Sequence, residues 1–393
     1  MNTEFYRRPL PTDLIGFASE TGRQIFREAL AEGNMEGYFA IAEQYHTQAE
    51  PAFCGLGSLV VALNAMAIDP GRLWQGPWRW FDETMLDCCV PFDRIRERGI
   101  TLHEFSCLAR CNGATAELHN AGTAASPPPP ASTSTASDAA LQAFRNQVAH
   151  TMAHADSGIV VVAYSRQALG QTGDGHFSPI GGYNAQRDQM LIMDVARFKY
   201  SPHWVNTADL FRAMTAIDAT TQRPRGWILL RRAPGGRPMM LRLFAAKNLG
   251  SIALTALVEA LEQALPTAQT VADVVDIFAK LAPTFWDTIG TFHDGPHLPT
   301  EHASEVQALL AGLAASPMAA LVKTSRVAPE LQPLIALLLL ALPERALTSA
   351  SLSLQTAFAT ARHIAATDDG LRREVAALSQ QLAVVWCGPA SCA

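Results

Sequence analysis

The chain has 393 residues, of which 49% are hydrophobic and 17% are charged, and its formal net charge is −6. This length fits two domains of roughly 150 to 200 residues, each with a sizeable apolar core. The acidic balance argues against nucleic acid or a membrane surface as a partner. The longest apolar run, residues 334–342, is too short for a helix to span a bilayer, so we expect no membrane protein.

The cysteines indicate the compartment. There are seven of them, an odd number, and the N-terminal residues contain no apolar stretch of signal-peptide length. An odd number of cysteines without a secretion signal favours free, reduced thiols over a disulfide framework. We therefore expect a cytoplasmic protein.

The first elements are expected to be helices. Apolar residues on one face predict a helix within 21–45. A turn at 51–55 precedes a second helix, whose apolar residues recur at intervals of three and four: Leu56, Leu59, Val60 and Leu63. Residues 82–98 suit one or two short helices. The next helix is expected to begin with a capping box formed by Thr101 and Glu104.

Two segments do not resemble regular elements. Residues 69–81 place three tryptophans among turn residues, and we expect them to form a buried wall beside a cleft. Residues 122–138 consist largely of proline, serine, threonine and alanine, a composition that cannot bury a core. This second segment is expected to be an insertion within the first domain.

Strands are expected after a helix at 138–155. Four runs have strand character: 158–164, 176–183, 189–195 and 227–231. A turn at 184–188 joins the second and third runs into a hairpin, which makes the predicted sheet antiparallel.

The second half of the chain changes character. It is rich in alanine and leucine at helical spacing, has prolines between the segments, and offers Thr270 as a helix cap. The predicted fold class is therefore α+β, with a catalytic domain at 1–235 and an all-helical domain at 245–393.

Cys54 is the residue that most suggests chemistry. It would lie in the first turn of a buried helix, where unpaired N–H groups and the helix dipole favour a thiolate. Gln48, six residues upstream, is an amide donor of the kind that stabilises the oxyanion in acyl transfer. A lone cysteine is more often a small buried hydrophobe, so a nucleophile also requires a base.

The hairpin offers a base and an acid. If its turn is centred near Gln186, residues whose numbers add to about 370 to 372 face one another, which brings His176 beside Asp194. His176 could then take the proton of Cys54, while Asp194 holds the required imidazole tautomer. Other histidines compete for the role of base: His46, His103, His150, His154 and His203.

Three stretches closely resemble phytochelatin synthases: 48–56, 69–89 and 175–200. The resemblance extends over about residues 5–232. It implies a papain-like fold and a dipeptidyl transpeptidase that cleaves glycine from glutathione. Such an enzyme holds γ-Glu-Cys as a thioester and passes it to another glutathione or to a growing phytochelatin.

The resemblance also assigns roles in catalysis. It places the nucleophile at Cys54, the base at His176, the orienting acid at Asp194 and the oxyanion donor at Gln48. These are the same four residues that the chemistry of the sequence selects.

Substrate contacts are implied in the same way. Asp218 and Arg225 would hold the α-amino and α-carboxylate groups of the γ-glutamyl moiety, which suits their charges. Arg197 and Lys199 match basic residues that serve the acceptor glutathione. For these four residues a surface salt bridge is the alternative. Phe53 stands where plant members carry tyrosine, so the alternative function is a hydrolase that only removes glycine from glutathione or its conjugates.

Heavy metals are expected as activators or as part of the substrate, and no covalent cofactor is expected. Soft thiolates select Cd²⁺, Zn²⁺ and Cu⁺, and the acceptor preferred by the family resembles a metal bis-glutathionate. Four cysteines shared with the family could bind metal or simply pack helices: Cys88, Cys89, Cys107 and Cys111. If metal binding by these cysteines were the main function, the protein would be a thiol buffer rather than an enzyme.

The C-terminal half departs from the plant members. They carry cysteine pairs there, whereas this chain has only Cys387 and Cys392. We expect a stabilising helical module that supports a possible homodimer.

Overall fold

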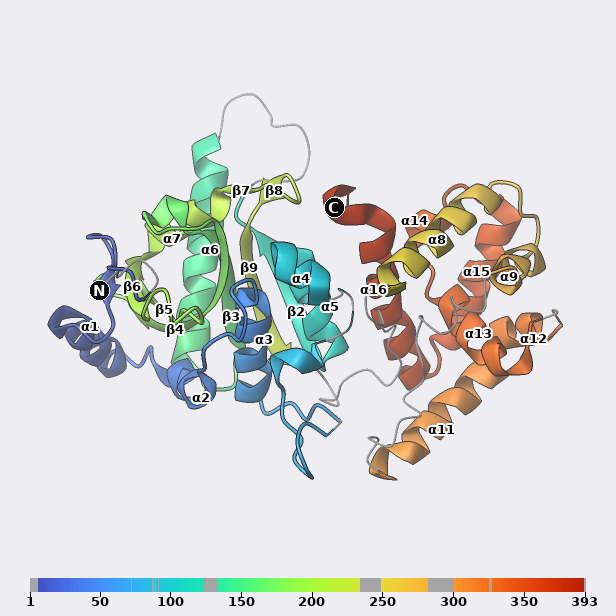
Figure 1. Cartoon of the computed structure of the whole chain (residues 1–393), viewed down its shortest axis with the longest axis horizontal. Helices are drawn as coiled ribbons and strands as arrows, with labels where there is room; N and C mark the ends of the chain where they lie inside the picture. The colour runs from blue at the N-terminus through green and yellow to red at the C-terminus, as the bar shows by residue number, and fades with distance from the viewer. Residues whose placement is uncertain are drawn as a thin grey trace. The chain divides into compact units, whose positions relative to one another are not determined.

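The computed structural model describes residues 6–71, 73–86, 88, 90, 92–122, 133–233, 249–281, 300–324 and 327–391. The chain divides into two units. One comprises residues 1–70, 80–86 and 94–237, and the other comprises residues 71–79, 87–93 and 238–393. The first contains an antiparallel sheet with helices and the second is helical (Figure 1). The predicted α+β class is confirmed.

A seven-stranded antiparallel sheet forms the centre of the first unit. Its strand order is β1-β6-β5-β4-β3-β9-β2. The strands are β1 (Ile15–Gly16), β2 (Ala114–Asn120), β3 (Ile159–Ser165), β4 (Gly175–Asn184), β5 (Gln189–Ile192), β6 (His203–Asn206) and β9 (Gly226–Arg232). A separate ribbon consists of β7 (Ile217–Asp218) and β8 (Arg223–Pro224).

Helices cover both faces of this sheet. They are α1 (Glu20–Ala31), α2 (Glu36–Gln44), α3 (Cys54–Ala65), η2 (Glu83–Met85), α4 (Phe92–Arg98), α5 (Leu102–Cys111), α6 (Thr133–Ala153), η3 (Gln167–Leu169) and α7 (Thr207–Thr215). On one face α6 and α7 bury Phe144 and Phe211 against Trp227 of β9. On the other face α5 stacks Phe105 on Phe177 of β4, with ring centroids 5.1 Å apart.

The β4–β5 hairpin carries the predicted base and acid. Its pairing runs from Asn184 with Gln189 to Ile180 with Ile192, with a β-bulge between Ile180 and Gly182. Next to the turn, the partner of each residue lies one position further along the chain than predicted. Beyond the bulge, the pairing agrees with the prediction. A Cβ atom at Gly181 would lie 2.7 Å from Met193 Cγ, so the bulge requires glycine there.

Several predicted elements are corrected by the structure. The helix expected at 21–45 is two helices, α1 and α2, because the chain turns at Gly33, which has a positive φ of 77°. The strand expected at 189–195 ends at Ile192. Helix α6 begins at Thr133, inside the segment 122–138 that was expected to be an insertion, and residues 123–132 lie outside the described residues.

The tryptophan-rich segment was predicted wrongly as a buried wall. Trp74, Trp78 and Trp80 are all exposed, and Trp78 is 70% exposed. Turn residues around them keep these rings out of a core. By contrast, the capping box at the start of α5 is confirmed, because Thr101 accepts from the Glu104 N–H and the Glu104 carboxylate accepts from the Thr101 N–H.

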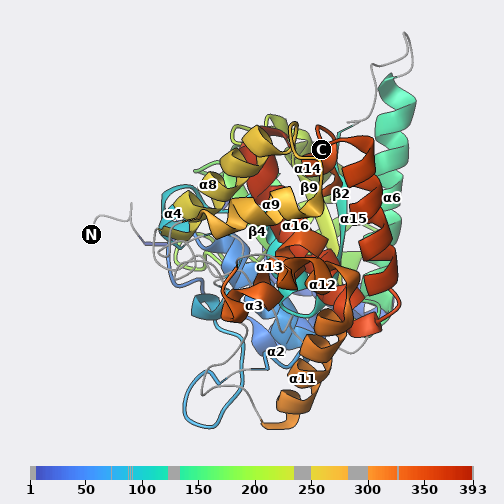
Figure 2. The ribbon, with the colours of Figure 1, turned by 90° about the vertical axis from the view of Figure 1, so that its right-hand side faces the viewer.

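The second unit consists of helices that pack around a central helix, α13, which is apolar and buried. They are α8 (Leu249–Ala264), α9 (Val271–Ala279), α11 (Thr300–Ala315), α12 (Pro317–Lys323), η4 (Pro329–Leu331), α13 (Gln332–Leu340), α14 (Glu344–Leu347), α15 (Leu352–Ala365) and α16 (Asp369–Ser391). Figure 2 shows α12 and α13 side by side. The apolar run at 334–342 is buried throughout, and Thr270 caps α9 in a capping box with Asp273. Among the described helices, none has the length and hydropathy that crossing a bilayer requires.

Candidate active site

Cys54 is the first residue of α3. This helix is buried from Gly55 to Asn64, and its N-cap residue, Phe53, makes no side-chain capping bond. The N–H groups at the start of the helix therefore remain available at the sulfur. Ser58, one turn further, donates a buried hydrogen bond of 3.0 Å to the carbonyl of Phe177 on β4. This bond ties the helix that carries Cys54 to the strand that carries His176.

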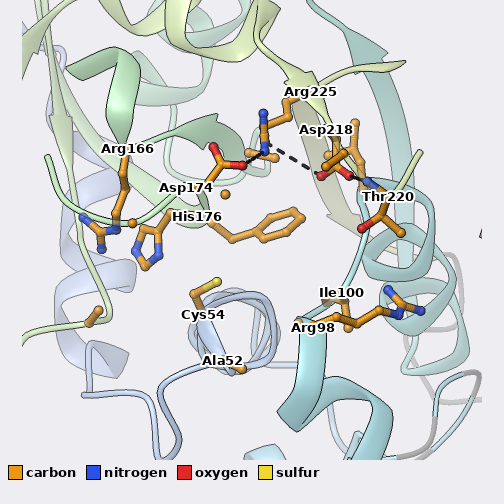
Figure 3. Close-up of a pocket in the computed structure, with 18 of the residues that line it drawn as sticks. Ala52, Cys54, Arg98, Ile100, Arg166, Asp174, His176, Asp218, Thr220 and Arg225 are labelled. Atoms are coloured by element: carbon orange, nitrogen blue, oxygen red, sulfur yellow. Dashed lines mark hydrogen bonds and ion pairs between the residues drawn. The ribbon is translucent and has the colours of Figure 1, made fainter. Parts of the chain in front are cut away.

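The Cys54 thiol is activated by its neighbours. Burial raises its pKa, but the positive charge of His176, a hydrogen bond with that side chain and the Phe177 N–H lower it, and the net pKa lies below the ordinary thiol value. Figure 3 shows the sulfur and the His176 ring on facing sides of the pocket. The arrangement therefore favours a nucleophilic thiolate.

His176 is oriented by Asp194. Its Nε2 lies 2.9 Å from Asp194 Oδ1, which leaves Nδ1 as the nitrogen that can serve Cys54. Burial and Arg166 lower the pKa of His176, whereas Asp194 and the Cys54 thiolate raise it, and the net pKa lies above the ordinary value. An imidazolium beside a thiolate is the resting form that these shifts favour.

Asp194 is completely buried. Its Oδ1 accepts from His176, from Arg166 Nη2 at 2.9 Å and from the Ala196 N–H at 2.9 Å. Oδ2 lies 2.8 Å from the same Arg166 nitrogen, an ion-pair contact without hydrogen-bond geometry. Burial raises the pKa of Asp194, but His176 and Arg166 lower it well below the ordinary range. This carboxylate therefore stays ionised.

Sequence reasoning missed the support behind Asp194. Arg166 follows strand β3, is 3% exposed, and donates through Nη1 to Gln171 Oε1 at 2.7 Å. Gln171 Nε2 lies 3.3 Å from Nε2 of His203, whose Nδ1 lies 2.9 Å from the Ser201 carbonyl. Burial lowers the pKa of His203, which favours the neutral ring that can accept from Gln171. An arginine directly after a fully buried strand is the signal that could have pointed to this network.

Gln48 lies close to Cys54 in sequence but its amide is occupied. The side chain is buried, and Nε2 donates to the carbonyls of Glu50 and Pro51 at 2.8 and 2.9 Å. Its Oε1 has no hydrogen-bond partner. Its backbone N–H donates to the Val195 carbonyl at 3.0 Å, directly beside Asp194. The structure thus brings Gln48 to the triad without aiming a free amide hydrogen into the pocket.

A pocket of about 430 Å³ opens over Cys54 and His176. Its far end carries a charged trio in which Arg225 lies between two carboxylates (Figure 3). Arg225 Nη2 lies 2.9 Å from Asp174 Oδ2, and its Nε lies 3.8 Å from Asp218 Oδ2. Nη1 donates to the Ala216 and Ile217 carbonyls. The sequence pointed to Asp218 and Arg225 but not to Asp174.

A comparison with family models matches residues 5–227 to the family described as phytochelatin synthase. The chain belongs to the phytochelatin synthase family. The matched region contains the triad, Gln48 and the charged trio. The helical second half lies beyond it.

Curated relatives agree with this assignment. Glutathione gamma-glutamylcysteinyltransferase 3 of Lotus japonicus is 50% identical over 233 residues, which are 58% of this chain and 45% of the relative. Glutathione gamma-glutamylcysteinyltransferase 2 of Arabidopsis thaliana is 46% identical over 62% of this chain and 50% of the relative. The enzyme of Schizosaccharomyces pombe is 44% identical over 58% of this chain and 52% of the relative. The alignments thus span about half the length of these relatives.

The residues assigned to the acceptor by the phytochelatin synthase resemblance lie in different surroundings. Lys199 lines the pocket, and burial together with Arg166 lowers its pKa. Arg197 is exposed and its guanidinium lies 5.0 Å from the ring centre of Tyr45. Phe53 is buried, with the guanidinium of Arg96 over its ring at 5.9 Å. Of these three, only Lys199 faces the space above Cys54.

The candidate metal ligands stay untested. Cys88, Cys107 and Cys111 are buried and take part in no disulfide among the described residues, and Cys89 lies outside those residues. Within the described parts of the chain, no three histidine, cysteine or acidic side chains gather closely enough to hold a metal ion. In this phytochelatin synthase family member, metal binding by these cysteines therefore remains a prediction.

Proposed function

We propose that the protein is a γ-glutamylcysteine dipeptidyl transpeptidase that makes phytochelatins from glutathione. The observation that carries this proposal is the contact of Cys54 with His176, which is itself held by the buried Asp194. A thiolate, a base and an orienting acid suffice for acyl transfer through a thioester. The family assignment and the names of the relatives supply the substrate class.

The first half-reaction releases glycine. The Cys54 thiolate adds to the carbonyl of the Cys–Gly peptide bond of glutathione, and the electron pair moves to the oxygen. The His176 imidazolium then protonates the glycine nitrogen, the C–N bond breaks, and γ-Glu-Cys remains on Cys54 as a thioester. Asp194 keeps the ring oriented through both proton transfers.

The second half-reaction extends the chain. The α-amine of a second glutathione, or of a phytochelatin, attacks the thioester carbonyl while the neutral His176 accepts a proton from the amine. The C–S bond breaks and the Cys54 thiolate returns. Water in place of the amine would give free γ-Glu-Cys.

The oxyanion needs donors at both stages. The Cys54 backbone N–H at the start of α3 is one, since the first N–H groups of a helix have no partner within it. Gln48 is the second that we propose. To donate, its amide must exchange one of its two backbone carbonyl partners for the oxyanion.

Substrate recognition is proposed at the charged trio. Asp218 would hold the α-ammonium of the γ-glutamyl group and Arg225 its α-carboxylate. Asp174 forms an ion pair with Arg225, so Asp174 and the substrate carboxylate would have to share the Arg225 guanidinium. Lys199, and further out Arg197, would attract the carboxylates of the acceptor.

Heavy metals enter this proposal as part of the substrate. Two glutathione thiolates on one Cd²⁺ or Zn²⁺ ion form an acceptor whose sulfur atoms are masked and whose amines stay free. The metal then stimulates the reaction by raising the concentration of this acceptor.

One experiment tests the proposal. Glutathione is incubated with the protein and Cd²⁺, and mass spectrometry follows glycine and the (γ-Glu-Cys)n-Gly products. We expect both, and neither with the Cys54→Ser variant. If intact wild-type protein releases no glycine, the proposal is wrong.

A hydrolase is the second candidate, favoured by Phe53. Its buried ring offers no hydroxyl beside the nucleophile to help hold an acceptor amine. The products decide, because hydrolysis gives glycine and γ-Glu-Cys in equal amounts without longer chains.

A further inference from the structure

Outside the pocket, a buried carboxylate contacts the loop that leads to Cys54. Glu83 of η2 is 3% exposed. Its Oε2 accepts a hydrogen bond of 2.9 Å from the Ala49 N–H, and its Oε1 lies 3.4 Å from His46 Nε2. A buried carboxylate is costly unless it is paired, so the burial of Glu83 favours keeping both partners in contact with it.

The two partners of Glu83 flank Gln48 in the chain. The Gln48 N–H is itself fixed to the Val195 carbonyl, next to Asp194. The segment 46–49 is therefore held on one side by the residues after β5, which include Asp194, and on the other by Glu83. Neither contact involves the side-chain amide of Gln48, which donates to the Glu50 and Pro51 carbonyls and can exchange one of them without moving the backbone.

Helix α3 positions Glu83 in turn. The side chain of Asn64 holds both backbone groups of Phe81, donating to its carbonyl at 3.0 Å and accepting from its N–H at 3.2 Å. At Gly57 an added Cβ would lie 2.8 Å from Glu83 Oε1 and 3.2 Å from Gln48 Cβ. The helix that begins with Cys54 thus carries the contacts that bring Glu83 against the loop.

We propose that Glu83, together with His46, is a positioning residue for acyl transfer that holds segment 46–49 so that Gln48 stays beside the start of α3. This inference rests on the proposed function only in its effect on turnover. The effect of Glu83 on the mobility of segment 46–49 can be measured without substrate.

The strength of the contact between Glu83 and His46 depends on pH, because the imidazole titrates. Its ring is partly exposed, and the charged groups that face it are Glu83 and Asp82. The hydrogen bond to Glu83 raises the pKa of His46. The contact is therefore an ion pair when His46 is protonated, and a hydrogen bond from the neutral imidazole to the Glu83 carboxylate at higher pH.

Hydrogen exchange tests the hold on the loop directly. In Glu83→Ala we expect the amides of a peptide covering residues 46–53 to exchange about tenfold faster than in wild type. The matched control, Glu43→Gln, changes an exposed glutamate of α2 and should exchange as wild type does. Unchanged exchange in a folded Glu83→Ala protein overturns the inference, whether or not wild type acts on glutathione.

Turnover tests the consequence. Glycine release by Glu83→Ala should fall about tenfold in kcat, with KM for glutathione nearly unchanged. In Glu83→Gln, which keeps an acceptor for Ala49 but no charge for His46, the deficit relative to wild type should be larger at about pH 6 than at about pH 8.5. Adding His46→Gln should remove that difference. Full kcat in Glu83→Ala, or a Glu83→Gln deficit equal at both pH values, would refute the proposal. The Glu83→Gln variant preserves the test if Glu83→Ala does not fold.

Discussion

Arg166 and Asp194 form a buried ion pair directly behind His176, with Arg166 Nη2 at 2.8 Å from one carboxylate oxygen and 2.9 Å from the other. Both side chains are almost completely inaccessible to water. The charge of Asp194 is therefore balanced from two sides, by Arg166 and by His176. The ionised state of Asp194 therefore depends on Arg166, which also lines the pocket over Cys54.

Replacing Arg166 should be costly for stability as well as activity. Arg166→Ala leaves only His176 to balance the buried charge of Asp194, and we expect a loss of about 3 to 5 kcal/mol in the free energy of unfolding. Urea denaturation measures it. The control Arg145→Ala breaks a partly exposed pair with Asp188 and should cost about 1 kcal/mol or less. Equal losses in the two variants would show that burial of the Arg166 pair is unimportant.

The pH dependence of thiol alkylation tests the ion pair at the nucleophile. Because the pKa of Cys54 is lowered, iodoacetamide should react with it at pH values below the ordinary thiol pKa of about 8.5. In His176→Gln the charge that lowers this pKa is lost, so the midpoint should move to higher pH. Mass spectrometry of the peptide containing Cys54 gives the rate. An unshifted midpoint would mean that His176 does not activate the thiol.

Asp174 should compete with substrate for Arg225. Its carboxylate is 51% exposed and lies on the Nη2 group that a substrate carboxylate would use. We expect Asp174→Asn to lower KM for glutathione about two- to fivefold with little change in kcat. Steady-state glycine release measures both constants. A higher KM would instead indicate that Asp174 binds the substrate ammonium group.

Replacing Gly57 by alanine should destabilise the protein, although the same replacement within a helix is usually stabilising. Within a helix, glycine to alanine normally stabilises by about 1 kcal/mol. At Gly57 the new methyl group meets Glu83 and Gln48, so we expect a destabilisation of about 1 to 3 kcal/mol. The control is Gly312→Ala in α11, where the close contact is only the movable carboxylate of Asp368. Thermal unfolding compares them, and a Gly57→Ala protein as stable as the control would contradict the packing argument.

The contact between His176 and Asp194 could be predicted from the sequence because paired strands place residues opposite one another at fixed distances from the turn. Counting back from the turn brought His176 near Asp194, although the bulge at Gly181 could not be foreseen. Arg166 and Glu83 could not be predicted in this way. Each reaches its partners through tertiary contacts between distant segments. The place of Arg166 directly after a buried strand indicates burial but not which residues it contacts, and Glu83 in the short η2 resembles an ordinary surface residue. The short strands β1 and β6 were missed for a related reason, since two to four residues give too little periodicity.

The polar chain that runs from His203 through Gln171 and Arg166 to Asp194 and His176 exists only when β3, β4 and β6 are assembled. In an unfolded chain Cys54 would have the acidity of any other thiol. The lowered pKa of Cys54 thus reports native structure, and unfolding that separates these strands would raise it again.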